Sequence, residues 1–384
     1  MKKIIAAFCL FISGFAAAHT VDVRILSTMA VTSVNVSAHS GSYLLYLDGK
    51  LQPDSLSGKV FQLLVINDSI EVRIPGDTLG RFASFRLLSE NDSSCFKIKP
   101  IKPSSGTRMY DHTLSITVIN GSMECINTVG LDNYVAGVVE SEAGGKTTKE
   151  FYKVQAILCR TYALAHLYRH ATEGFEVCDG VHCQAYRGRP TDPNVLLAVE
   201  ETEGLVLVDK SLTLITPAFF SNCGGQTANS EDVWSVPVPY LRSVKDTFCL
   251  HSPNARWTRK IAKEDWLNYL ALKHKYPVND SAACYSALNM SQGTRTPYYS
   301  YGGIRIPYKT IRNDWQLRSA YFSIEEAKDS IIIRGRGYGH GVGLCQEGAI
   351  VMAKRGYTYD WILDYYYKDV EIINLSKLEF FKEE

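Results

Sequence analysis

The fold of this chain is decided by LDNYVAGVVESEAG at residues 131–144 and KEFYKVQAILCRTYALAHLYRHA at 149–171, where the sequence changes from strand-like to helical. In the second stretch, apolar side chains recur at steps of three and four residues, which is the spacing of one helix face. The first stretch is mostly apolar and ends at Gly144 and Gly145, and glycine commonly follows the last turn of a helix. The two stretches therefore predict a pair of helices.

Residues 19–125, upstream of this pair, are short apolar or alternating runs separated by Gly, Asn, Asp or Ser, which is typical of strands. We expect small sheets or a barrel-like module there, acting as a platform. Residues 126–384 mix helices, strands and a glycine-rich loop, with a less patterned insertion at about 250–330. The predicted fold class is α+β: a β-rich N-terminal portion, then a mixed helix/strand core whose glycine-rich loop lines a cleft.

The N-terminus has the layout of a cleavable secretory signal. Lys2 and Lys3 precede an apolar run that is too short to span a bilayer, and small residues follow it at 16–18. We predict a signal peptide over residues 1–18, with an uncleaved anchor as the alternative. No later stretch is long and apolar enough for a membrane span, so we expect an exported protein without a transmembrane segment in its mature chain.

Charge and cysteine content narrow the function classes. Lys and Arg number 41 against 40 Asp and Glu, without a basic stripe, so nucleic acid is not an expected partner. Ten cysteines are present, and one of them, Cys9, lies in the predicted signal. Export would place the others in an oxidising compartment, where disulfides are the default. Their odd number means that at least one thiol is free, metal-bound or paired with another chain.

Glu140 and Glu142 are acid–base candidates because they lie in an otherwise apolar segment. On a helix, residues two apart point in directions that differ by about 200°, so the two carboxyls cannot share one face. A carboxyl beside apolar walls has a raised pKa, which keeps it protonated and able to donate. The alternative is a pair of ordinary surface glutamates near a helix end.

A glycine-dense segment, GRGYGHGVGLCQEGA at 335–349, surrounds His340. Such density lets the backbone take positive φ and approach a ligand closely. The lysine and hydroxyl that end a phosphate-binding loop are missing, which leaves a binding loop or a tight turn with a satisfied histidine. Ser221 or Cys223 with His340 would suit nucleophilic catalysis, but neither a Gly-x-Ser-x-Gly elbow nor a partner acid accompanies them. This is the weaker enzyme hypothesis.

A third group of candidates is Cys178, His182 and Cys183, with His170 or His166 just upstream. Two thiolates and two imidazoles suit tetrahedral zinc, although their spacing is not that of a standard zinc finger. A disulfide between Cys178 and Cys183 is the alternative in an exported chain.

Four segments resemble, in this order, the motif series of the SpoIID/LytB family, which includes a sporulation lytic transglycosylase and an amidase enhancer. They are LDNYVAGVVESEAG, VQAILCRTYALAH, FFSNCGGQTANSEDVW and GRGYGHGVGLCQEGAIVMAKRGYTYDWIL. The resemblance covers about residues 131–367 and is interrupted near 250–330. Cys345 stands where many relatives have serine, and Ala143-Gly144 stand where the family usually has Met-Pro.

The resemblance implies that Glu142 is the catalytic residue, because it occupies the last position of the family's Gly-Val-Val-x-Ser-Glu motif. It strengthens the zinc interpretation of His170, Cys178, His182 and Cys183, because some relatives carry a His/Cys cluster after the same helix. Substrate-binding roles are implied for residues of the other matching motifs, namely Lys153, Gln155, Arg160, Tyr162, Ser221, Gln226, His340 and Gln346.

The implied activity is that of a peptidoglycan lytic transglycosylase, exported to the periplasm, the cell wall or the extracellular space. Glu142 would donate a proton to the glycosidic oxygen between N-acetylmuramic acid and N-acetylglucosamine. It would then take the proton of the muramoyl C6 hydroxyl, which closes to a 1,6-anhydro product. No cofactor is required for this chemistry, so zinc would be structural. The expected substrate is glycan strands stripped of stem peptides. The alternative is a non-catalytic wall-binding enhancer of a separate cell-wall amidase.

Overall fold

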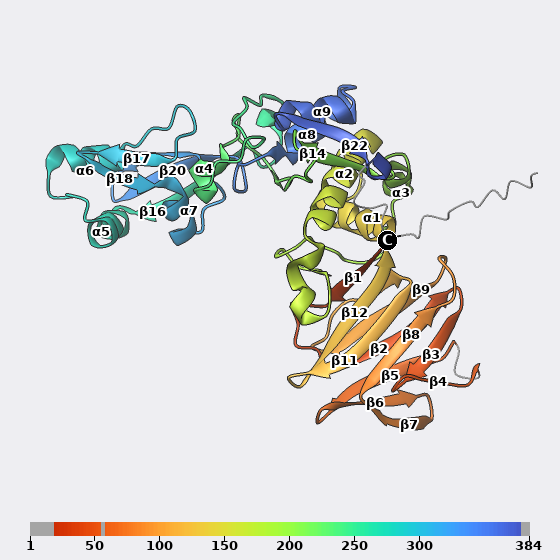
Figure 1. Ribbon diagram of the computed structural model, residues 1–384. Coiled ribbons are helices and arrows are strands. Elements are labelled where there is room, and N and C mark those ends of the chain that lie inside the picture. Colours follow the sequence, from red (N-terminus) through yellow and green to blue (C-terminus); the bar gives the residue numbers. More distant parts are fainter. Residues whose placement is uncertain (1–18, 55–57, 378–384) are drawn as a thin grey trace, which may run out of the picture. The chain divides into compact units, whose positions relative to one another are not determined.

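The structure is a computed structural model that describes residues 19–54 and 58–377 (Figure 1). The predicted signal peptide at 1–18 lies outside the described residues. The chain divides into two compact units between Tyr134 and Val135. Strands and helices are both abundant, so the predicted α+β class is confirmed.

The N-terminal unit contains two antiparallel sheets (Figure 1). One sheet has the order β1 (Thr20–Ile25), β12 (Ser122–Gly130), β11 (Thr113–Ile119), β8 (Ser84–Ser89), β3 (Tyr43–Leu47) and β4 (Lys50–Leu51). The other has the order β10 (Arg108–Asp111), β9 (Cys95–Lys102), β2 (Ser33–Ser40), β5 (Val60–Ile66), β6 (Ser69–Ile74) and β7 (Asp77–Phe82). Phe61 and Phe85, one from each sheet, meet edge to face with ring centroids 5.5 Å apart. The core therefore lies between the sheets, and strands such as β12 contribute alternate side chains to it.

The predicted helix pair is present as α1 (Leu131–Ala143) and α2 (Lys149–Ala165). α2 begins at a Thr148 cap, where the hydroxyl accepts a hydrogen bond from the Phe151 N–H at 3.4 Å. The helix is buried along most of its length and packs against α3 (Pro193–Glu200), α8 (Gln346–Lys354) and α9 (Tyr359–Tyr366). α2 is thus the central helix of the C-terminal unit.

Short elements connect these helices. A parallel bridge between β15 (Phe219–Phe220) and β21 (Leu344–Cys345) brings the SNCGG loop beside the start of α8. Other short elements of this unit are β13 (Val177–Cys178), β14 (Leu205–Asp209), α4 (Ser230–Trp234) and β22 (Val370–Asn374). The strands β14 and β22 pair with each other.

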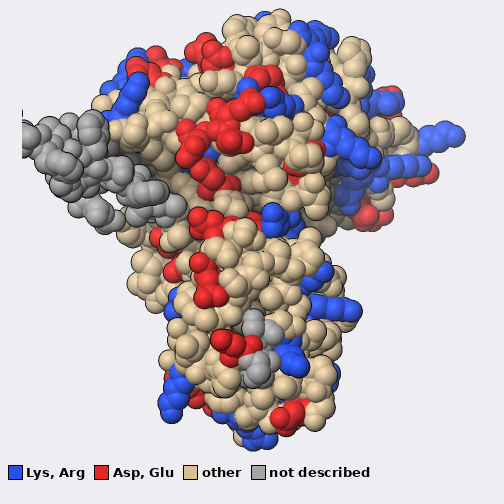
Figure 2. Space-filling view, turned by 90° about the vertical axis from the view of Figure 1, so that its right-hand side faces the viewer, with Lys and Arg blue, Asp and Glu red and all other residues tan. Residues whose placement is uncertain are grey.

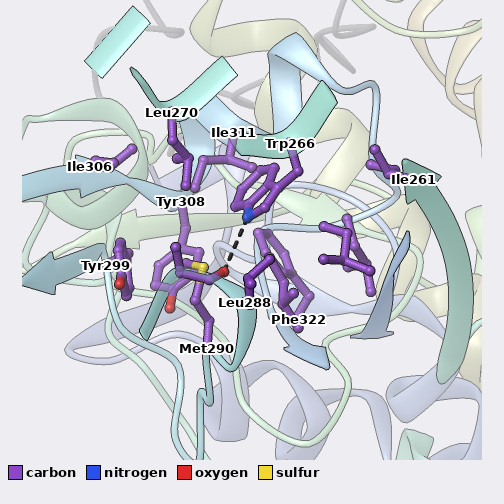
Figure 3. Packing of buried hydrophobic residues seen from close by; sticks show 14 of the residues in the cluster. Ile261, Trp266, Leu270, Leu288, Met290, Tyr299, Ile306, Tyr308, Ile311 and Phe322 are labelled. Carbon is purple, nitrogen blue, oxygen red and sulfur yellow. Dashed lines mark hydrogen bonds between the residues drawn. The ribbon is translucent and has the colours of Figure 1, made fainter. Parts of the chain in front are cut away.

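Residues 256–336, most of the predicted insertion, form a module with a hydrophobic core of its own (Figure 3). Trp266 is fully buried in it, and its indole N–H donates to the Ala287 carbonyl at 3.1 Å. The larger sheet of the module has the order β16 (Arg256–Ala262), β20 (Ser330–Arg336) and β19 (Phe322–Ala327). The other elements of the module are α5 (Lys263–His274), α6 (Ser281–Leu288), β17 (Tyr298–Tyr301), β18 (Ile304–Pro307) and α7 (Tyr308–Asp314).

None of the described helices is long and apolar enough to cross a membrane. The face drawn in Figure 2 carries basic and acidic side chains in several small groups, and neither sign covers it. This distribution agrees with the near balance of charges in the sequence.

Candidate active site

Glu142 lies in the last turn of α1, partly buried. Its carboxylate oxygen Oε1 accepts a hydrogen bond from the Ala185 N–H at 2.8 Å. Burial raises the pKa of this carboxyl, while the Ala185 hydrogen bond and the charge of Arg187 act in the opposite direction. Burial is the largest of the three effects, so the protonated form is favoured relative to an exposed glutamate.

The segment 185–188 is held closely against α1. The Arg187 N–H donates to the Ser141 hydroxyl at 3.0 Å, next to the bond that Ala185 makes with Glu142. A Cβ at Gly137 would lie 2.3 Å from the Gly188 carbonyl oxygen, so only glycine allows this approach. The glycine that opens the GVVESE sequence thus lets the 185–188 segment reach Glu142.

Glu140 is used differently from Glu142, as helix geometry predicts. Its carboxylate accepts hydrogen bonds from the N–H groups of Thr191 and Asp192 at 2.9 and 2.8 Å. Asp192 is the N-cap of α3, so Glu140 fixes the entry to that helix. Both oxygens of Glu140 contact this segment, which favours a structural role.

Two α2 side chains with predicted substrate roles, Arg160 and Lys153, bind other groups of the protein. Arg160 is fully buried and donates to the carbonyls of Thr202 and Leu205 at 2.8 and 3.2 Å, just after α3. Lys153 pairs with Glu150 and Glu201 at 2.9 and 2.7 Å. These contacts favour structural roles for both cations.

Gln155 and Tyr162, the other two α2 residues with predicted substrate roles, also form hydrogen bonds within the protein. Gln155 is fully buried, and its amide donates to the Cys159 sulfur at 3.6 Å. Burial raises the pKa of the Cys159 thiol, and the Glu142 carboxylate adds to this effect while Arg160 opposes it. Cys159 therefore lies near both Glu142 and Arg160. Tyr162 accepts a hydrogen bond from Arg169 at 2.7 Å.

The glycine-rich loop holds His340 by both ring nitrogens. Nε2 donates to the Phe219 carbonyl at 3.0 Å, and Nδ1 accepts from the Val342 N–H at 3.1 Å. The ring contacts the rings of Phe220 and Trp234, with centroids 5.2 and 5.3 Å away. Burial lowers its pKa to about 4, so the imidazole is neutral near pH 7. The sequence left a binding loop and a satisfied histidine as alternatives, and this geometry favours the second.

The remaining predicted residues lie at the start of α8 and in or just after the SNCGG loop. Gln346, the first residue of α8, donates to the Glu142 carbonyl at 3.4 Å, so the structure brings these two together. The Gln226 amide is used within the fold: it accepts from the Arg295 N–H and donates to Ser243, both at 3.1 Å. The Ser221 carbonyl accepts from the Glu347 N–H at 3.0 Å.

The predicted metal ligands His170, Cys178, His182 and Cys183 do form one cluster. Their ligand atoms all lie within 4.8 Å of one another, and the Cys183 sulfur is 3.4 Å from His170 Nε2. The other ring nitrogen of His170 is 2.6 Å from a Glu173 carboxylate oxygen. A carboxylate in that position orients a metal-binding imidazole, so the donor set fits tetrahedral zinc. The described cysteines are all free in the structure, so the alternative of a Cys178–Cys183 disulfide is not the arrangement seen here.

Sequence reasoning missed the groups that surround Glu142 from outside its motif. Ala185 and Arg187 follow the Cys/His segment, and no periodicity indicated that they return to α1. The apolar position of Cys159 in α2 likewise gave no signal of its place near Glu142. A clue was available in Gly137, because a glycine inside a helix often marks a close backbone approach.

Comparison with known proteins identifies the class. The SpoIID family model, described as a stage II sporulation protein, matches residues 119–208. A protein of Brachyspira hyodysenteriae described as uncharacterized is 30% identical over 272 residues, which cover 70% of this chain and 73% of that protein. The chain therefore belongs to the SpoIID/LytB family.

Two relatives in Bacillus subtilis have descriptive names. Stage II sporulation protein D is 29% identical to this chain over 299 residues, or 74% of this chain and 85% of that protein. A protein named amidase enhancer is 29% identical over 284 residues, or 60% of this chain and 39% of its own length. The chain thus resembles both branches of the family.

Proposed function

We propose that this chain is an exported cell-wall enzyme that cleaves the bond between N-acetylmuramic acid and N-acetylglucosamine in peptidoglycan glycan strands, leaving 1,6-anhydro ends. The proposal is carried by Glu142, a partly buried carboxyl with a raised pKa at the catalytic position of the family motif. Membership in the family and the likeness to stage II sporulation protein D support it.

The environment of Glu142 suits a group that is first an acid and then a base. Burial favours the protonated form, which donates to the glycosidic oxygen as the bond breaks. The carboxylate that results accepts the hydrogen bond of the Ala185 N–H, which stabilises the negative charge. It then removes the proton of the C6 hydroxyl, whose oxygen attacks the anomeric carbon of the same sugar.

A single carboxyl is sufficient for this reaction, because the nucleophile belongs to the substrate. A hydrolase would need a second carboxylate to activate water or to attack the sugar. Glu140, the nearest acid in sequence, is engaged with the backbone of Thr191 and Asp192. The arrangement therefore favours the intramolecular reaction over hydrolysis.

The test is mass spectrometry of soluble products from glycan strands stripped of their stem peptides. Wild type should release products with 1,6-anhydro ends, and Glu142→Gln should release none. Glutamine is close in shape and still accepts from the Ala185 N–H, so the fold should be retained. Glu140→Gln is the matched control and should keep the activity. Reducing ends in place of anhydro ends would refute the mechanism.

The second candidate is a non-catalytic protein that binds wall and enhances a separate amidase. The relative named amidase enhancer supports it, as does the internal use of Lys153, Arg160 and His340. An enhancer should raise the rate at which a purified cell-wall amidase releases peptides, and Glu142→Gln should raise it equally. Strand shortening by the chain alone would decide against this candidate.

For the His170, Cys178, His182 and Cys183 cluster we propose a structural zinc ion. It would fix the segment that leads from α2 to Ala185 and so hold the hydrogen-bond donor of Glu142 in place. Zinc removal should therefore lower activity without changing the products.

A further inference from the structure

A second group of metal-ligand side chains lies in the C-terminal unit, outside the machinery described above. Cys223, Asp246, Cys249 and Cys345 offer three sulfurs and a carboxylate oxygen, all within 4.8 Å of one another. All four residues are fully buried. A buried carboxylate beside three thiols is costly unless a cation or a set of donors compensates it.

The distances within this group suit one small, thiophilic cation. The sulfurs of Cys223 and Cys249 are 3.3 Å apart, and the Cys223 sulfur is 3.3 Å from an Asp246 oxygen. Zinc–sulfur bonds of about 2.3 Å place the corners of a tetrahedral site roughly 3.8 Å apart. The observed separations are somewhat shorter than this and far longer than a disulfide bond of about 2.05 Å.

Hydrogen-bond donors surround the ligand atoms of this group, as they commonly do around the ligands of a metal ion. Asp246 accepts from the Tyr366 hydroxyl and from the Phe248 N–H, both at 2.9 Å. Backbone N–H groups point at sulfur: Cys223 N–H at Cys345 Sγ (3.2 Å), and Gly225 N–H at Cys223 Sγ (3.4 Å). Such donors orient the ligands and stabilise thiolates.

A partly buried cation, Arg295, and a glycine, Gly348, lie next to the same group. The Arg295 guanidinium donates to the Cys223 carbonyl at 3.0 Å and interacts electrostatically with the thiols of Cys223 and Cys345. A Cβ at Gly348 would lie 2.3 Å from both Asp246 Oδ2 and the Tyr366 hydroxyl, so glycine is required for these two to meet. The fold thus gathers these groups at a close approach that a larger residue would prevent.

We propose that Cys223, Asp246, Cys249 and Cys345 bind a structural zinc ion, in addition to the His170 cluster. Binding displaces the three thiol protons, and the divalent cation offsets half of the four negative charges that result. All four coordination positions are filled by the protein, which is the pattern of a structural rather than a catalytic zinc.

The ion would clamp three segments that are distant in sequence. Cys223 belongs to the SNCGG loop, Asp246 and Cys249 to the segment before the module, and Cys345 immediately precedes α8. Gln346, the next residue, donates to the Glu142 carbonyl. Tyr366 of α9 is tied to the site through Asp246. The zinc would therefore hold α8 in the position where it contacts the Glu142 turn.

The test counts zinc in the purified mature chain by native mass spectrometry and elemental analysis, after preparation under reducing conditions. Cys178→Ser with Cys183→Ser removes the other cluster and should leave one zinc ion per chain. Adding Cys249→Ser and Cys345→Ser to that chain should remove it. Asp246→Cys should retain zinc, because it supplies a fourth thiolate, and Tyr366→Phe should weaken zinc binding about 10-fold.

Wild type provides a test that does not depend on folding of the variants. Cys223, Cys249 and Cys345 should resist alkylation with zinc bound and become reactive together when a chelator is added. The proposal is overturned if the chelator exposes only Cys178 and Cys183, or if peptide mapping finds a Cys223–Cys249 disulfide. It is also overturned if the Cys178→Ser, Cys183→Ser chain is folded and holds no zinc. Metal content is independent of glycan cleavage, so failure of the proposed activity would leave these results unaffected.

Discussion

The end of α1 and the loop around His340 are the two regions to which the sequence points most strongly, yet they use their titratable groups in opposite ways. The Glu142 carboxylate accepts a hydrogen bond from the Ala185 N–H, and burial raises its pKa. His340 has both ring nitrogens bound to the backbone and a pKa lowered to about 4, also by burial. Burial disfavours charge in both, but only the carboxyl is thereby made a better proton donor near neutral pH.

The largest expected effect is a difference in strand-cleavage rate between variants of Glu142 and of His340. If the proposed chemistry is right, Glu142→Gln should lower the rate of strand cleavage by about 10²–10⁴-fold, the usual contribution of general acid–base catalysis. His340→Gln should lower it far less, because His340 supports the loop. Initial rates on peptide-stripped strands, measured well below the melting temperature of each variant, provide the comparison. Equal losses would mean that His340 takes part in the chemistry.

The next effect concerns stability at acidic pH. His340 has a folded-state pKa of about 4 against an ordinary value of 6.5, so only the unfolded chain takes up a proton there between these values. Stability should therefore fall by about 3 kcal/mol as the pH drops from 6.5 to 4. Denaturant unfolding of wild type and His340→Gln over this range measures the difference. A wild-type profile parallel to that of the variant would show that the histidine is not held neutral.

Glu142 should contribute to stability with the opposite sign. Its folded-state pKa is raised, so its contribution is fully present below the unfolded value of 4.5 and is lost as the pH rises through the folded value. The same titration should reduce the proposed activity at high pH, because the acid form is consumed. Glu142→Gln should remove this slope in unfolding experiments, and Glu140→Gln should leave it in place.

A smaller effect is expected from Gly137→Ala, which tests the contact between α1 and the 185–188 segment. The new Cβ would clash with the Gly188 carbonyl and the Tyr186 ring, at 2.3 and 2.5 Å. Overpacking of this kind costs about 1–3 kcal/mol, and it should also displace the donor of Glu142. Thermal unfolding and cleavage rates should both decline. Gly145→Ala is a control, since a Cβ there meets no atom within 4 Å.

The smallest effect should come from Glu140→Gln. Glutamine can still accept from the N–H groups of Thr191 and Asp192, so we expect a loss of about 1 kcal/mol or less. Cleavage rates at a temperature where both chains are folded should be nearly equal. A loss comparable to that of Glu142→Gln would show that two carboxyls share the reaction.

The sequence by itself determined the features that depend on neighbouring residues. Periodicity predicted α2, the apolar run that ends at Gly144 and Gly145 predicted α1, and helix geometry predicted that Glu140 and Glu142 diverge. The His170 cluster could also be predicted, because its ligands lie within one short stretch. In each case the residues concerned lie close together in the chain, so their spacing can be read from the sequence alone.

Only the tertiary structure decided which polar groups are occupied by the protein and which distant groups meet. The family resemblance implied a substrate-binding role for Arg160, but its side chain is fully buried and donates to carbonyls of the segment after α3. Cys223 and Cys345 come together through the β15–β21 bridge, and Asp246 through the bridge between Gln226 and Lys245, which no local pattern encodes. The core around Trp266 draws on elements from β16 to β20, each too short to show its buried face alone. Such contacts join segments far apart in the chain, so packing rather than sequence spacing determines them.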